Sequence, residues 1–155
     1  MGHHEDRLAT PERRGATTPI STCDTEEIAE AVEELAGSEG AHCVVDSVSN
    51  TESTATAHAA VGAGGTIACL GTDHLAGKTP SVNWYDQFVR NINITGGIIP
   101  MGRYIPGLIF EVEAGRLDPA PVWSHTLPLD EAPQGCQLMR GRAEGVIKVA
   151  LRTSS

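Results

Sequence analysis

Three short apolar runs, separated by segments with helical spacing, constrain the fold of this chain more than any other feature. The runs cover residues 43–48, 66–70 and 92–95, and each is followed by glycine or by small polar residues. Short continuous apolar runs are typical of strands in parallel sheets, which helices cover on both faces. The sequence therefore predicts an α/β fold built on a doubly wound parallel sheet.

The helix before the first run has clear boundaries. Asp24 can cap residues 25–36, Glu27 completes a capping box with it, and Gly37 ends the helical pattern. The predicted buried face consists of three residues at helical spacing: Ile28, Val32 and Leu35. Asn50 can cap the next helix, whose alanine- and threonine-rich sequence depends on close packing more than on helix propensity.

The pattern changes after Pro100. A helix is predicted over residues 103–114, with four apolar residues buried: Ile105, Leu108, Ile109 and Val112. An extended segment, a short helix and a final strand over residues 146–151 follow. The sequence thus predicts two domains, residues 1–100 and an α+β extension over residues 101–155.

Charge and composition exclude several classes of function. The formal net charge is −9 and Lys and Arg number only 11, so we expect no nucleic-acid partner. No apolar run approaches the length of a membrane span and no signal peptide is recognisable, so we expect no membrane partner. The four cysteines are far apart in the sequence, which predicts a reducing, cytoplasmic location. The six histidines lack metal-ligand spacing, and we expect no metal site on this chain.

Two glycine-rich segments and one polar pair resemble catalytic motifs but fail their spacing tests. Residues 62–65 follow a helix and precede a strand, the reverse of a dinucleotide-binding loop, and are predicted to form a turn. Residues 71–79 have five residues before Gly-Lys-Thr, where a phosphate-binding P-loop has four. Ser124 and His125 lack the surroundings of a nucleophile elbow and are predicted to be a polar pair in an extended segment. We therefore expect no catalytic residue here.

The predicted strand ends are the best candidate for a ligand site. In doubly wound sheets, ligands bind beyond the carboxyl ends of the strands. Those ends fall at residues 46–49, 70–72 and 96–99, and two of them contain glycine, which lets a flat ligand approach the backbone closely. The pattern alone predicts a nucleotide-binding sheet.

Several segments around these ends carry a more specific signal. They are residues 90–97 (RNINITGG), 113–119 (EAGRLDP), 125–132 (HTLPLDEA) and 146–149 (VIKV). In this order and spacing they resemble the C-terminal half of zinc-type medium-chain alcohol dehydrogenases. The resemblance implies an incomplete Rossmann-like domain that binds NAD or NADP, followed by a segment that returns to the catalytic domain. The activity implied is hydride transfer between an alcohol or polyol and the nicotinamide.

The resemblance also implies which residues contact the cofactor. Ser47 and Val48 would line the adenosine side, and Lys148 would reach the phosphates. The nicotinamide ribose and amide would lie along a second group of residues: Leu70, Gly71, Thr72, Gly97 and Ile99. The start of the chain corresponds to the strand end that selects the adenosine ribose, which implies a third group: His3, His4 and Arg7. No acidic residue occupies that position itself, which favours NADP over NAD.

The family pattern includes parts that this sequence does not contain. The G-x-G-x-x-G turn that binds the pyrophosphate is absent from the sequence, as are the family's catalytic zinc ligands. We therefore expect a truncated chain that is not active alone, with zinc and the catalytic residues in a missing N-terminal domain. One alternative is a fragment of a zinc-free medium-chain quinone or enoyl reductase. Another is a non-catalytic remnant that pairs with a full-length subunit through residues 92–100, an edge that could also form a homo-oligomer.

Overall fold

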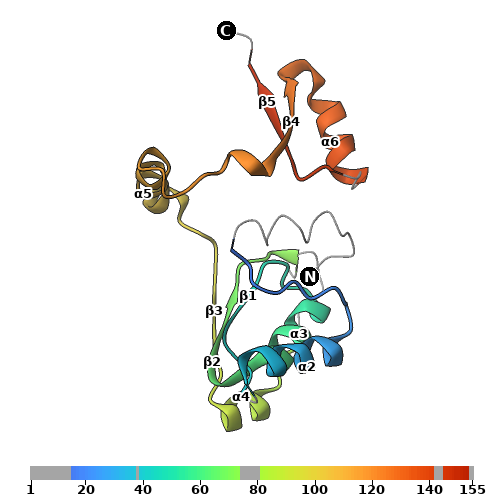
Figure 1. Cartoon of the computed structure of the whole chain (residues 1–155), viewed down its shortest axis with the longest axis vertical. Helices are drawn as coiled ribbons and strands as arrows, with labels where there is room; N and C mark the ends of the chain where they lie inside the picture. The colour runs from blue at the N-terminus through green and yellow to red at the C-terminus, as the bar shows by residue number, and fades with distance from the viewer. Residues whose placement is uncertain (1–14, 38, 74–80, 142–144, 154–155) are drawn as a thin grey trace. The chain divides into compact units, whose positions relative to one another are not determined.

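A computed structural model describes residues 15–37, 39–73, 81–141 and 145–153 (Figure 1). His3, His4 and Arg7 lie outside these residues. The chain divides into two compact units, one ending at Ile99 and the other starting at Pro100. The assignment of the two segments to cofactor binding and to the catalytic domain stays a prediction, and each unit is described by itself.

The first unit contains a three-stranded parallel sheet. Its strands are β1 (Ala41–Asp46), β2 (Val61–Cys69) and β3 (Asn93–Gly96), in the order β1-β2-β3. The α/β class and the parallel pairing predicted from the apolar runs are confirmed. The sheet is incomplete, as expected, because β1 is paired only with β2 among the described residues.

The start of β2 corrects one prediction. Residues 62–65 do not form a turn but lie in the strand, where the register against β1 shifts between Ala41 and Cys43. Gly62 is needed there because a Cβ atom would overlap the backbone carbonyl of Glu39. The glycines thus serve a close approach of two backbone segments, and the rejection of a phosphate loop at this position still holds.

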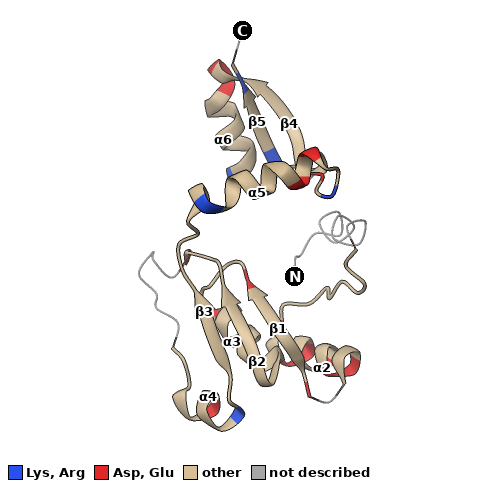
Figure 2. Cartoon of the chain, turned by 90° about the vertical axis from the view of Figure 1, so that its left-hand side faces the viewer, with Lys and Arg blue, Asp and Glu red and all other residues tan. Residues whose placement is uncertain are grey.

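Helices cover one face of this sheet. They are α2 (Thr25–Ala36) and α3 (Thr51–Ala60), which pack against each other and against the strands, while the shorter α4 (Trp84–Arg90) contacts β2 (Figures 1 and 2). The buried core between helices and sheet consists of apolar residues from these elements: Ile28, Ala57, Val61, Ile67 and Ile92. Figure 2 also shows that acidic residues gather on α2, as expected for a solvated face.

The opposite face of the sheet is exposed, contrary to the prediction that helices cover both faces. Val45 shares a register row with Ala68 and Thr95, and its side chain is 60% exposed. No helix of the described residues shields this row. The apolar run containing Val45 is typical of a strand buried on both faces, but burial also requires a covering layer, which these residues do not provide.

The helix caps follow the sequence closely, with one difference. The Asp24 carboxylate accepts hydrogen bonds from the backbone N–H groups of Glu26 and Glu27, and Gly37 ends α2 with φ 82°. Glu27 does not bond back to Asp24. Its carboxylate instead accepts a hydrogen bond from the Thr22 hydroxyl at 2.5 Å, and that hydroxyl accepts from the Asp24 N–H at 3.2 Å. Of the predicted apolar face of α2, Ile28 is buried, Val32 is half-buried and Leu35 is exposed.

The second unit is a helix followed by a small α+β layer. Its elements are α5 (Met101–Glu113), two short 3-10 helices η2 (Ala120–Val122) and η3 (Leu129–Glu131), β4 (Trp123–Pro128), α6 (Ala132–Gly141) and β5 (Lys148–Arg152). The strands β4 and β5 pair in parallel, and α6 packs against them. Gly135 permits this packing, since a Cβ atom there would lie 3.2 Å from Val149 Cγ1.

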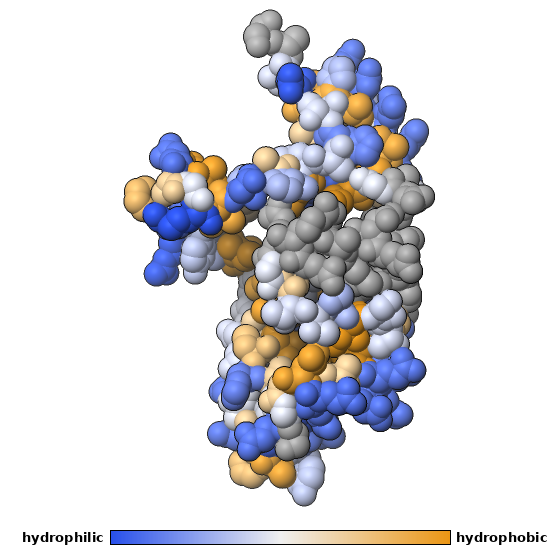
Figure 3. Space-filling model, in the orientation of Figure 1, coloured by the Kyte–Doolittle hydropathy of each residue, from blue (hydrophilic) through white to orange (hydrophobic). Residues whose placement is uncertain are grey.

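Helix α5 forms where predicted but is not buried. Its four apolar positions are 39–52% exposed: Ile105, Leu108, Ile109 and Val112. Figure 3 shows apolar side chains at the surface of α5. The spacing predicts correctly that these residues share a face, but no element in the described part of the chain packs against it.

Candidate functional site

The carboxyl ends of the three strands lie in one row. The register pairs Asp46 with Cys69 and Cys69 with Gly96, the last residues of β1, β2 and β3. The residues that follow these ends, Ser47 and Leu70 among them, therefore leave the sheet along the same edge. The structure thus brings together the strand ends at which the sequence predicts a ligand site.

The turns after β1 and β2 are in direct contact. The Asp46 carbonyl accepts hydrogen bonds from the N–H groups of Leu70 at 2.8 Å and Gly71 at 3.3 Å, and the Val48 carbonyl accepts from Asp73 N at 3.2 Å. A Cβ atom on Gly71 would overlap the Val48 carbonyl group. Glycine at position 71 is therefore required for the two turns to meet, and the predicted adenosine-side and nicotinamide-side residues are neighbours here.

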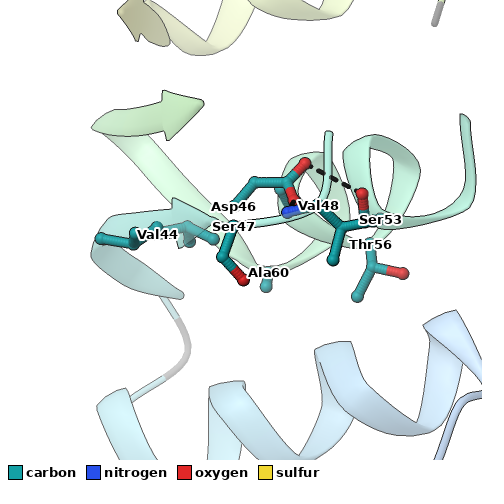
Figure 4. A pocket seen from close by; sticks show the side chains of 9 residues that line it. Val44, Asp46, Ser47, Val48, Ser53, Thr56 and Ala60 are labelled. Carbon is teal, nitrogen blue, oxygen red and sulfur yellow. Dashed lines mark hydrogen bonds between the residues drawn. The ribbon is translucent and has the colours of Figure 1, made fainter. Parts of the chain in front are cut away.

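One buried carboxylate organises the turn after β1. Asp46 is 5% exposed, and its Oδ1 accepts from the N–H groups of Val48 at 3.0 Å and Ser49 at 2.8 Å. Its Oδ2 accepts from the hydroxyl of Ser53 at 3.0 Å (Figure 4). The Thr54 hydroxyl also donates to this oxygen, at 3.5 Å. Asp46 thus connects the end of the strand to the first turn of α3.

The sequence analysis named residues 46–49 as a strand end but missed this role of Asp46. A signal was available, because an Asp side chain at the start of a turn often accepts a hydrogen bond from the backbone N–H two residues on. Ser49, the residue so held, has a left-handed backbone with φ 58°. Asn50 then caps α3 in a reciprocal capping box with Ser53.

A small cavity of about 160 Å³ lies between the end of β1 and helix α3 (Figure 4). Ser47 and Val48 line it from the turn, and Ser53, Thr56 and Ala60 line it from the helix. Among the described residues, the polar side chains that line it carry hydroxyl groups or the Asp46 carboxylate, and none is cationic. Hydroxyl side chains of this kind can form hydrogen bonds with the hydroxyl groups of a sugar. The volume is below the several hundred Å³ of a typical ligand pocket, so the cavity can hold only part of a ligand.

The remaining predicted residues are exposed, as a contact surface would be. Leu70 is 48% and Ile99 52% exposed, and Thr72 and Gly97 are also exposed. A Cβ atom on Gly97 would have no heavy atom within 4 Å, but φ 148° is unfavourable for other residues. Lys148 is exposed on β5 and belongs to the second unit.

Two titratable side chains in the described part of the first unit have shifted pKa values. Burial, with a further contribution from the Asp46 carboxylate, raises the pKa of the Cys69 thiol. The protonated thiol is a poor nucleophile. Burial also lowers the pKa of His58, whose two buried ring nitrogens have no hydrogen-bond partner among the described residues. Arg90 lies beside it and donates hydrogen bonds to the carbonyls of His58 and Val61. The lowered pKa favours the neutral form of the His58 imidazole.

The described residues hold neither a metal cluster nor a helical membrane span. They contain no group of three or more His, Cys, Asp or Glu side chains arranged to hold a metal ion. Among the helices of these residues, none has both the length and the apolar character needed to cross a membrane.

The parallel sheet with glycine-bearing turns at its carboxyl ends defines a Rossmann-like domain of the medium-chain dehydrogenase type. The sequence model of the family described as zinc-binding dehydrogenase matches residues 1–112. The chain therefore belongs to the zinc-binding dehydrogenase family, and the resemblance stated from its sequence segments is confirmed.

Curated relatives extend the match beyond the first unit. The chain is 33% identical over 153 residues to a probable zinc-binding alcohol dehydrogenase of Mycobacterium tuberculosis. This match covers 97% of this chain and 38% of that protein. It is 37% identical over 93 residues to the uncharacterized zinc-type alcohol dehydrogenase-like protein AdhB of Bacillus subtilis, covering 60% of this chain and 24% of that protein. The chain thus spans well under half the length of these relatives.

Solved structures agree with this assignment. The alcohol dehydrogenase TADH from Thermus sp. ATN1 matches 97% of this chain and 42% of its own, with a TM-score of 0.84 and 27% identity. A NAD-dependent alcohol dehydrogenase covers the same shares with a TM-score of 0.79 and 26% identity. A mycobacterial protein complexed with NADPH shares the fold at 18% identity and a TM-score of 0.75, covering 96% of this chain and 46% of its own.

Proposed function

We propose that this chain forms part of the cofactor site of a zinc-dependent, NAD(P)-linked alcohol or polyol dehydrogenase. The observation that carries the proposal is the contact between the turns after β1 and β2, where Gly71 packs directly against the Val48 carbonyl. That contact lies at the carboxyl edge of a parallel sheet, where ligands of such sheets bind. The family membership and the NAD- or NADPH-linked structural neighbours support a nicotinamide dinucleotide as the ligand.

Different residues of this chain are proposed to contact the adenosine, nicotinamide and phosphate parts of the dinucleotide. Ser47 and Val48, which line the cavity, are proposed to contact the adenosine side. A second set is proposed to contact the nicotinamide ribose and amide: Leu70, Gly71, Thr72, Gly97 and Ile99. For the phosphates we propose Lys148, whose exposed side chain can offer an ammonium group. When bound, the nicotinamide would accept or donate the hydride, and the residues of this chain would orient it.

We propose that NADP is preferred over NAD. The proposal rests on His3, His4 and Arg7, because cationic or neutral side chains at a ribose-selecting position suit the additional 2′-phosphate, whereas an acidic side chain favours NAD. These residues lie outside the described part of the chain.

We further propose that the zinc chemistry belongs to the part of the relatives that this chain does not match. The family match supports a zinc-dependent enzyme over a zinc-free quinone or enoyl reductase. In such an enzyme a bound zinc would supply Lewis-acid polarisation of the alcohol oxygen.

Calorimetric titration of the full 155-residue chain with NADPH and NADH tests the cofactor proposal. We expect dissociation constants weaker than about 0.1 mM, because the sequence holds no G-x-G-x-x-G turn to bind the pyrophosphate. NADPH should bind more tightly than NADH. Micromolar affinity for either cofactor would contradict a partial site, and a clear preference for NADH would contradict the assignment of NADP.

We propose the edge strand β3 as the surface for pairing with a homologous subunit, including a second copy of this chain. All four residues of β3 are exposed, and the strand pairs only with β2 among the described residues, which leaves backbone groups available for another strand. Sedimentation with and without a homologous dehydrogenase checks this. A Thr95→Pro variant, which places a proline on the edge strand, should pair less well, and a chain that stays monomeric in both mixtures would contradict the proposal.

A further inference from the structure

A β-bulge on β4 lies opposite the Lys148–Val149 step of β5 in the small sheet of the second unit. The register pairs Trp123 with Lys148 and His125 with Val149, so Ser124 on β4 is an extra residue without a partner of its own on β5. A bulge leaves local backbone groups outside the regular ladder of hydrogen bonds. Here the side chain of the bulged residue supplies the missing bonds.

The Ser124 hydroxyl forms hydrogen bonds with the backbone of residues 147 and 148. Its oxygen accepts hydrogen bonds from Ile147 N at 2.9 Å and Lys148 N at 3.2 Å, and it donates to the Lys148 carbonyl at 2.9 Å. A hydroxyl has one proton and two lone pairs, so these three bonds use its whole capacity. The His125 Nδ1 atom, 3.1 Å away, contacts an oxygen that is already satisfied.

The segment entering β5 is fixed on its other side as well. Gly145 turns the chain with φ 74°, and Val146 follows as a buried apolar residue that is 4% exposed. Ile147 and Lys148 are thus held between a buried side chain and a hydroxyl bonded to both amides. The exposed Lys148 side chain starts from a fixed backbone, although its own stem is long and flexible.

We propose that Ser124 is a positioning residue for Lys148 in cofactor binding. The inference rests on the proposed function, in which the Lys148 ammonium contacts the cofactor phosphates. Binding a phosphate immobilises the lysine, and the entropy lost is smaller when the backbone beneath it is already fixed. The polar pair at positions 124 and 125, predicted to be a structural feature of an extended segment, thereby acquires a role at the site.

The test compares variants of the full chain by NMR titration with NADPH at low ionic strength, where weak binding is measurable, and by amide hydrogen exchange at Ile147 and Lys148. Ser124→Ala removes the hydroxyl, whereas Ser124→Thr retains one. Thr126→Val is the matched control, since it removes an exposed hydroxyl of the same strand that has no side-chain hydrogen bond to the rest of the described chain. Lys148→Met removes the ammonium and keeps much of the stem.

We expect Lys148→Met to weaken NADPH binding about tenfold and Ser124→Ala about threefold. Ser124→Ala should also accelerate exchange at Lys148, because the amide loses its acceptor. The Ser124→Thr and Thr126→Val variants should behave like the unsubstituted protein. In the Lys148→Met background, Ser124→Ala should cause no further loss of affinity, which a merely structural role of Ser124 does not predict.

Four outcomes would overturn the inference, and they contradict different parts of it. If Ser124→Ala leaves the affinity unchanged while Lys148→Met weakens binding, the positioning role alone is wrong. The same holds if Ser124→Ala weakens binding equally with and without Lys148. If Lys148→Met has no effect, or if NADPH shifts no signal of the unsubstituted chain, the proposed contact between Lys148 and the cofactor fails and the positioning role fails with it.

Discussion

Replacing Asp46 by alanine is expected to lower the free energy of unfolding of the first unit by about 3 kcal/mol. The carboxylate is 5% exposed and accepts from two backbone N–H groups and two hydroxyls, which would lose their acceptor inside the protein. The turn after β1 and the first turn of α3 would then no longer be connected. Urea unfolding followed by circular dichroism measures the loss, and amide exchange at Val48 and Ser49 locates it.

Two companion variants show whether the effect comes from the hydrogen bonds. Asp46→Asn keeps one carbonyl oxygen for the backbone N–H groups and should cost clearly less than Asp46→Ala, because the Ser53 and Thr54 hydroxyls can reverse and accept from the amide. Asp130→Ala removes an exposed aspartate and should be close to neutral. If the two alanine variants were equally stable, Asp46 would not hold the turn together.

Replacing Gly71 by alanine should destabilise the same unit by about 2 kcal/mol or more and separate the two turns at the candidate site. The added methyl would overlap the backbone carbonyl of Val48, which is not the flexible end of a side chain and cannot rotate away. The bonds from Leu70 N and Gly71 N to the Asp46 carbonyl should lengthen, so exchange of those amides should accelerate. Urea unfolding and amide exchange measure both effects.

Gly107→Ala provides the matched control, because the same substitution in helix α5 places the methyl in open space. There the change should be neutral or stabilise the helix by up to about 1 kcal/mol. A Gly71→Ala chain with unchanged stability and unchanged exchange at Leu70 would show that the turns can meet without glycine, and the geometry proposed for the cofactor site would then be wrong.

The local features were readable from the sequence because they depend on neighbouring residues. Asp24 and Gly37 bound α2 as predicted, since caps act over one helical turn. The apolar runs also predicted the parallel strands correctly, because the run of apolar residues that indicates such a strand is a local pattern. The predicted hydrogen bond from the Asp24 N–H to the Glu27 carboxylate was wrong. Thr22, a residue outside the helix, donates to that carboxylate and accepts from the Asp24 N–H in its place.

Burial was predicted less well because it depends on what lies across from a side chain. Val45 on the sheet and Ile109 on α5 have the periodicity of buried residues, yet both are more than half exposed. Periodicity shows that residues share a face, but a face becomes a core only when another element covers it. The glycines at 62–65 were placed in a turn because the approach of the Glu39 backbone has no signature in local sequence.

The sequence by itself determined the α/β class, the main caps and the resemblance to zinc-type dehydrogenases, because all of these rest on local patterns and on segments in a fixed order. Tertiary structure alone decided that Gly71 meets Val48 and that Ser124 bonds to the backbone at Lys148. Both contacts join residues whose pairing follows from strand register, and a shift of one residue in register would abolish both of them.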